Sequence, residues 1–160
     1  MAELTTLEEK LAEVTGLAKA AQEATQKVEG LVDDEELAGQ LQRMREEAAE
    51  TEHRCSELAD KRDGKKTAIL EKAQETKNEA AQMMSTYLGS DADDLDGFEF
   101  LTMAEAGELG HWEILGKLNE KAAEPELKEL VDWALPIQER HLRDVREGSL
   151  ALAAQEDPGG

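Results

Sequence analysis

The stretch LTMAEAGELGHWEILGKL, residues 101–118, decides the fold class. Its apolar residues recur at spacings of three and four, the period of an α-helix with one buried face. That face comprises Leu101, Ala104, Trp112, Leu115 and Leu118. At about 100° per residue, Glu108 and His111 fall within about 40° of its centre. The stretch therefore predicts a helix that carries two polar side chains into a core.

A second segment, residues 125–154, repeats this arrangement. Its apolar face comprises Leu130, Ala134, Ile137, Val145 and Leu152. Gln138 and His141 fall on that face, three residues apart, as Glu108 and His111 do, and positions i and i+3 of a helix are neighbours. Carboxylates and imidazoles inside a helix bundle are how ferritin-like proteins hold a pair of metal ions. We therefore expect Glu108, His111 and His141 to converge in the interior.

Three more helices precede these two. Apolar residues at helical spacing mark residues 4–29, a second helix capped by Asp33 or Asp34 that reaches Leu58, and a third that reaches Tyr87. Gly30, the Asp63-Gly64 pair and the polar loop GSDADDLDG, residues 89–97, separate them from one another and from a helix over residues 98–122. The pattern predicts an all-α antiparallel bundle of the first, second, fourth and fifth helices. The third is expected to be a crossover or covering element. Residues 1–154 are predicted to form one domain, and residues 155–160 a disordered tail.

The composition and the net charge reduce the number of function classes that fit this chain. The formal net charge is −20 over 160 residues. This charge repels nucleic acid and anionic membranes, so we expect neither as a partner. No apolar run reaches the roughly 18 residues of a membrane span, and the N-terminal residues lack a signal pattern, which favours the cytoplasm. The sequence contains no nucleophile–base pair, phosphate loop or nucleotide fingerprint, and therefore no predicted catalytic or cofactor-binding residue.

Three stretches resemble a stress-induced bacterial ferritin-like family, the YciE/YciF type. That family has a Glu-His-Tyr-Glu-Ile run where this chain has Gly110-His111-Trp112-Glu113-Ile114. Its His-x-x-Glu-Thr helix is similar to EEAAETEHRCSEL, residues 46–58, with Glu47 in the histidine place and Glu50-Thr51 matching. Its Leu-x-x-x-Leu-x-Glu-Glu segment is similar to LPIQERHL, residues 135–142, with Gln138 in place of a usual glutamate. The resemblance covers residues 35–150.

The resemblance implies a ferritin-like four-helix bundle with one additional helix, a dimer, and a dimetal site for iron or manganese. The sequence departs from a full site, which uses about four carboxylates and two histidines. Glu108 is the one clear carboxylate, Glu105 and Glu47 lie at the edges of apolar faces, and the first helix supplies none. Any oxidase activity of a diiron or dimanganese centre is therefore expected to be weak.

The pair Glu50 and His53 has ferritin-like spacing, but both lie more than about 130° from the centre of the apolar face. We expect them to face solvent unless the bundle buries that helix on two sides.

Three functions stay open from the sequence. The first is a metal-binding bundle with a partly degenerate site formed by Glu108, His111, His141, Gln138, Glu105 and Glu47. The second is a metal-free scaffold or interaction protein in which the same Glu, His and Gln side chains form a buried polar network. The third is cargo of an encapsulin shell, because Gly148-Ser149-Leu150 resembles the core of a loading peptide. The long apolar face of the first helix predicts a homodimer.

Overall fold

The computed structural model describes residues 2–160 and consists of five α-helices within that range. They are α1 (Thr6–Glu29), α2 (Glu35–Asp60), α3 (Lys66–Tyr87), α4 (Asp94–Ala122) and α5 (Pro125–Ala153). No strand occurs among the described residues. The all-α prediction is therefore confirmed.

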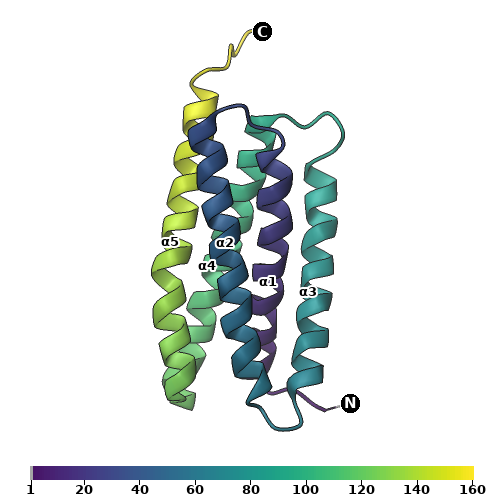
Figure 1. The fold of residues 1–160 in the computed structure, drawn as a ribbon, viewed down its shortest axis with the longest axis vertical. Helices are drawn as coiled ribbons and strands as arrows, with labels where there is room; N and C mark the ends of the chain where they lie inside the picture. Colours follow the sequence, from purple (N-terminus) through teal and green to yellow (C-terminus); the bar gives the residue numbers. More distant parts are fainter. Residues whose placement is uncertain (1) are drawn as a thin grey trace.

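The helices α1, α2, α4 and α5 form a four-helix bundle, and α3 lies outside it against α1 (Figure 1). The chain ascends in α1 and descends in α2. Helix α3 then returns along the length of the bundle, so α4 runs in the same direction as α2, and α5 ascends again (Figure 1). One long crossover is the connectivity of ferritin-like bundles. The prediction that the third helix is a crossover and covering element is confirmed.

Side-chain caps define the starts of three helices. Thr5 and Glu8 form a capping box at α1, and Asp34 accepts from the backbone N–H groups of Glu36 and Leu37 at α2. At α4, Asp93 and Asp96 form a second capping box. This box starts α4 at Asp94, inside the segment that the sequence predicted to be a loop, because its two reciprocal hydrogen bonds satisfy N–H groups that a helix end leaves open.

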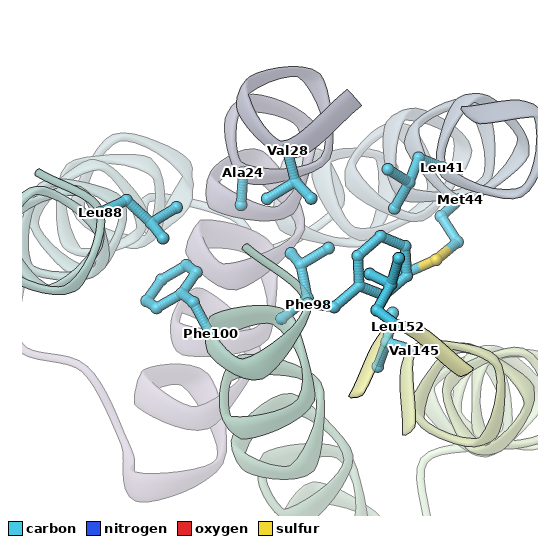
Figure 2. Close-up of a cluster of buried hydrophobic side chains, with 10 residues drawn as sticks. Ala24, Val28, Leu41, Met44, Leu88, Phe98, Phe100, Val145 and Leu152 are labelled. Carbon is cyan, nitrogen blue, oxygen red and sulfur yellow. The ribbon is translucent and has the colours of Figure 1, made fainter. Parts of the chain in front are cut away.

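Two apolar clusters fill the bundle at different heights. The cluster near the C-terminal end of α1 is shown in Figure 2 and includes Val28, Leu41, Phe98, Val145 and Leu152. The cluster near the opposite end includes Leu11, Cys55, Trp112, Leu127 and Ala134. Along α4 and α5, residues 102–111 and 135–144 lie between the two clusters. The polar side chains of these segments therefore interrupt the core at mid-height.

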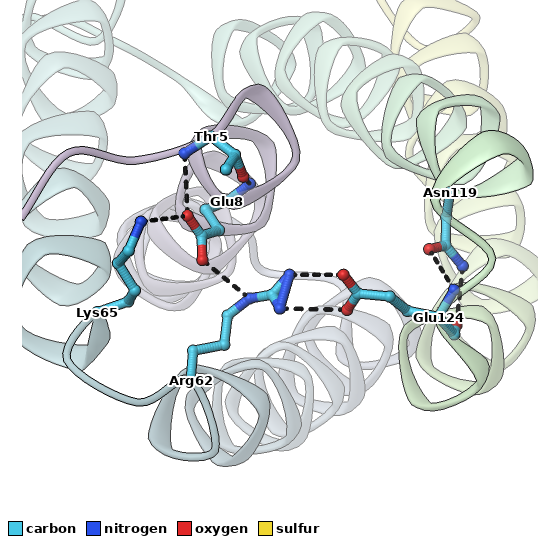
Figure 3. A network of polar contacts seen from close by, with 6 residues as sticks. All are labelled: Thr5, Glu8, Arg62, Lys65, Asn119 and Glu124. Atoms are coloured by element: carbon cyan, nitrogen blue, oxygen red, sulfur yellow. Dashed lines mark hydrogen bonds and ion pairs between the residues drawn. The ribbon is translucent and has the colours of Figure 1, made fainter.

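A polar network ties the loops at one end of the bundle together (Figure 3). Arg62, just after α2, donates from both Nη atoms to the Glu124 carboxylate at 3.2 and 2.9 Å, and its Nε lies 3.4 Å from Glu8 Oε2. Lys65 donates to Glu8 Oε1 at 3.1 Å. The side-chain amide of Asn119 donates to the backbone carbonyl of Glu124 and accepts from its backbone N–H. Burial raises the pKa of Glu8, but hydrogen bonds from the Thr5 backbone and Lys65 outweigh it and leave this pKa lowered.

Replacing Arg62 with alanine is expected to lower the free energy of unfolding by about 1–2 kcal/mol, because Glu8 is buried and would lose a charged partner. Chemical denaturation of the Arg62→Ala variant measures this loss. Lys117→Ala is the matched control, since Lys117 forms an exposed pair with Glu120, and such pairs contribute about 0–1 kcal/mol. Equal losses in the two variants would contradict a bracing role for Arg62.

Candidate metal centre in the bundle core

Four polar side chains form a belt between the two apolar clusters. Glu105 and Glu108 of α4 are 2% and 4% exposed, and Gln138 and His141 of α5 are 1% and 3% exposed. The prediction that Glu108, Gln138 and His141 point into the core is confirmed. Glu105 is more deeply buried than its place at the edge of the apolar face predicted, because α4 packs against both α1 and α5.

His141 of α5 contacts acidic side chains of two other helices, α2 and α4. Its Nε2–H donates to Glu47 Oε1 of α2 at 2.9 Å. Its other ring nitrogen, Nδ1, faces Glu105 Oε2 of α4 at 3.8 Å. The guanidinium of Arg140 pairs with the second oxygen of Glu47. The hydrogen bond to Glu47 therefore fixes the ring and leaves the lone pair of Nδ1 on the side of the α4 carboxylates.

The belt holds acceptor atoms that have no donor. Glu105 Oε2, Glu108 Oε2 and Gln138 Oε1 are buried without a hydrogen-bond partner among the described residues. The indole Nε1 of Trp112, one turn after Glu108, is a buried donor that also has no hydrogen-bond partner among the described residues. An unpaired buried polar group costs about 1–3 kcal/mol. Two carboxyl groups and one amide group thus each contain a buried oxygen that receives no hydrogen bond.

Burial changes the acid–base behaviour of the belt. It raises the pKa of Glu108 to about 8. The pKa of Glu105 also lies well above its ordinary range, because of burial first and the charge of Glu108 second. Burial lowers the pKa of His141, against the opposing effect of its bond to Glu47. At neutral pH the imidazole is therefore neutral, the form that coordinates metals.

His111 does not lie in the core, and its predicted convergence with Glu108 and His141 in the interior is wrong. Its side chain is 40% exposed, and Nε2 lies 3.8 Å from Glu13 Oε2 of α1. Nδ1–H donates to the carbonyl of Gly107 at 2.8 Å. The side of α4 that carries His111 faces the gap toward α3, which touches α4 only slightly. His111 is thus partly exposed to solvent, although it lies near the centre of the apolar face of α4.

The other predicted residues divide between core and surface. Glu47 is half-buried and reaches the belt through His141. Glu50 and His53 are exposed and bind Arg54 and Glu57 of their own helix, as predicted for solvent-facing residues.

On α1, the polar side chains of Thr15 and Gln22 are bound to groups outside the belt. Thr15 donates to the Leu11 carbonyl, and Gln22 donates to Glu52 at 2.7 Å.

Sequence reasoning missed two features. The first is Arg140, which pairs with Glu47 and compensates its charge. The sequence position of Arg140 next to His141 could have indicated this role. At the end of the bundle where α4 begins, Asp93, Asp94 and Glu156 bring three carboxylate oxygens within 4.8 Å of one another. Asp93 and Glu156 are exposed, and Asp93 already caps α4.

Comparisons with known proteins returned no family model and no curated protein that matches the chain. Within residues 2–160, none of the helices combines the length and the apolar character needed to cross a lipid bilayer.

Proposed function

We propose that the protein is a ferritin-like bundle that binds one divalent cation in the polar belt. The observation that carries this proposal is the orientation of His141, whose Nε2–H donates to Glu47 while Nδ1 faces Glu105. Histidines that bind metals commonly donate their second ring N–H to a carboxylate, which fixes the ring and strengthens the ligand. Here Glu47 has that orienting role rather than the role of a ligand.

The ligand set would be Nδ1 of His141, the carboxylates of Glu105 and Glu108, and the amide oxygen of Gln138. The ligand atoms of His141, Glu105 and Glu108 do not all lie within 4.8 Å of one another as the structure places them, so a cation would have to draw them together. Three side chains of the ligand set contain the buried acceptor atoms that have no partner. A cation placed among them would compensate the cost of burying them. Its charge would also favour release of the protons that burial keeps on the two carboxyl groups.

The donor set favours one ion of manganese or iron over a pair. A dimetal site uses about four carboxylates and two histidines, and the belt contains two carboxylates and one histidine. Oxygen and imidazole ligands suit Mn²⁺ and Fe²⁺. Cys55 does not compete as a soft ligand, since burial raises the pKa of its thiol to about 12. Without bridging carboxylates, the site is proposed to bind metal and not to activate oxygen.

Gln138→Glu is expected to raise the affinity for Mn²⁺ about tenfold, because a charged ligand replaces a neutral amide. Glu108→Ala should abolish most of the binding. Calorimetric titration of chelator-treated protein with Mn²⁺ measures both effects, and His53→Ala, on the exposed face of α2, is the control that should not change them. If Gln138→Glu lowers the melting temperature equally with and without Mn²⁺, the metal site is refuted.

A metal-free scaffold is the second candidate, and the chain of bonds from His141 through Glu47 to Arg140 favours it. In that case the belt is a polar network that specifies how the helices pack. It would bind no Mn²⁺, and Gln138→Glu would only destabilise the fold by burying another carboxyl group.

The homodimer stays a prediction, but the apolar face of α1 is no longer the surface expected to form its interface. The long apolar face of α1 is covered within the chain by α2, α4 and α3. Any dimer must therefore use other surfaces. Sedimentation at moderate salt tests for it.

A further inference from the structure

The surface shared by α3 and α4 carries most of the exposed apolar side chains. Among residues 2–160, five large apolar side chains are exposed, and four of them belong to these two helices: Met83, Tyr87, Met103 and Ile114. Met83 and Met103 line the same groove between α1, α3 and α4, and the rings of Tyr87 and Phe100 lie 6.1 Å apart. The apolar residues of the two helices therefore meet at this groove, and we call the four exposed residues the α3–α4 face.

This face has few charges, unlike the chain as a whole. Charged residues make up 35% of the sequence, yet none occurs between positions 80 and 87 of α3. Between positions 100 and 112 of α4, the charged residues are Glu105 and Glu108, and both are buried. The remaining titratable residue of that stretch is His111, which is partly exposed. An apolar surface of this kind, on a chain of net charge −20, indicates an interface with another protein.

The α4 residues on this face are arranged symmetrically. Met103, Gly107, Gly110 and Ile114 follow one another at intervals of four, three and four residues, and they lie within about 60° of one another around the helix. Met103 and Ile114 are 39% and 49% exposed, and a Cβ atom added to either glycine meets no neighbouring atom within 4 Å. We call these four residues the α4 row. Its order of large, small, small and large side chains is the same in both directions, so the row is complementary to itself when two helices run antiparallel.

Two charged residues beside the α4 row favour the same pairing. Glu99 and Lys117 are exposed and lie on one side of the row, both about 50° from its centre. Within its own chain, Lys117 pairs with Glu120 of the same helix. A two-fold axis that places Met103 opposite Ile114 of the second copy also places Glu99 beside Lys117 of the second copy, twice by symmetry. Opposite charges therefore meet at two points, although the two chains carry the same net charge.

We propose that a second copy of this chain packs on the α3–α4 face, with the two α4 helices antiparallel along the α4 row. Gly107 of each copy would face Gly110 of the other, and the absence of side chains there lets the two helix backbones approach closely. Met103 and Ile114 would fill the space at both ends of the row, with the exposed residues of α3 at the margin of the contact. This dimer includes no member of the proposed ligand set, so it is independent of the proposed metal site.

Sedimentation equilibrium of the chelator-treated protein at micromolar concentration tests the association. The expected mass is twice the 17.6 kDa of one chain, and the dimer should tighten as salt screens the repulsion between two chains of net charge −20. Gly107→Glu should weaken dimerisation by about tenfold or more, because its carboxylate would be buried against the second copy. Gly39→Glu on α2, also free of neighbours, is the matched control and should not change dimerisation. A monomeric wild type, or equal effects of the two substitutions, would overturn the proposal.

Disulfide trapping tests the antiparallel register. The chain has one cysteine, Cys55, which is buried and does not compete. A mixture of the Met103→Cys and Ile114→Cys variants should form a disulfide-linked dimer on mild oxidation. Met103→Cys alone should not, because residues 103 of the two copies would lie about 16 Å apart at 1.5 Å per residue, and a disulfide needs Cα atoms within about 7 Å. Cross-linking of Met103→Cys with itself, or none in the mixture, would contradict the register.

Charge reversal tests the contact beside the row. Lys117→Glu should weaken dimerisation, because Glu99 of the other copy then faces a like charge. Adding Glu99→Lys to this variant should restore the wild-type affinity, since the opposite charges meet again with their positions exchanged. If the double variant dimerises as weakly as Lys117→Glu, the two helices do not pair in this way.

Discussion

Replacing Glu108 with glutamine is expected to stabilise the metal-free protein at pH 8 by several kcal/mol. Burial raises the pKa of Glu108 from 4.5 to about 8 in the folded protein. The folded state therefore holds a proton that the unfolded state releases at a lower pH. For such a group, the contribution to stability is full below pH 4.5 and is lost as the pH rises to about 8.

The expected size follows from the same shift. A difference of one pKa unit corresponds to about 1.4 kcal/mol, so the wild-type chain should lose of order 4 kcal/mol between pH 5 and pH 8. Glutamine has nearly the same shape and no proton to lose. Glu108→Gln should therefore be about as stable as the wild type at pH 5 and much more stable at pH 8. Urea denaturation at several pH values, with a chelator present, measures this difference.

Glu113→Gln is the matched control for the net charge. It removes one negative charge from the same helix at an exposed position. Its stability should keep the pH dependence of the wild type. If Glu108→Gln and Glu113→Gln depend on pH alike, the carboxyl group of Glu108 is not buried as the structure places it.

The second large effect is expected at Gly16 of α1, where α3 approaches most closely. A Cβ atom at this position would lie 2.3 Å from the backbone carbonyl oxygen of Ala73 and 2.8 Å from Thr76 Cβ. A backbone atom cannot move aside as a flexible side chain does, so α3 would have to shift away from α1. Gly16→Val is therefore expected to cost about 3 kcal/mol, the upper part of the usual range for overpacked cores.

Denaturation followed by circular dichroism measures this loss. Gly39→Val, in α2 with no neighbouring atom within 4 Å, is the control and should change stability by no more than about 0.5 kcal/mol. If Gly16→Val is as stable as Gly39→Val, α3 does not pack on α1 in the way the structure shows.

Gly148 shows how a motif read from sequence takes another meaning in the fold. The triplet Gly148-Ser149-Leu150 lies within α5, and Ser149 lies 3.0 Å from Thr102 through their hydroxyl groups. A Cβ at Gly148 would meet Phe98 at 2.5 Å. Close packing of α5 on the aromatic ring accounts for this glycine, so the triplet adds no support for a loading peptide.

The sequence by itself determined the five helices, the aspartate cap of α2 and most of the buried faces. Helical periodicity is local, so Trp112, Leu115 and Val145 could be assigned to the core from their spacing. The same spacing predicted that Gln138 and His141 are buried. Asp93 and Asp96 have the spacing of a capping box, which is also a local signal. The acidic composition of residues 89–97 led instead to the prediction of a loop.

Only the tertiary structure decided which polar groups meet. Glu108 and His111 both lie within about 40° of the centre of the apolar face of α4. Glu108 is nevertheless buried and His111 partly exposed, because α1 and α5 close on the helix whereas α3 leaves a gap beside it. The bond from His141 to Glu47 joins residues 94 positions apart in the sequence. A helical period specifies the direction of a side chain from its own axis, whereas the packing of neighbouring helices determines what that side chain encounters.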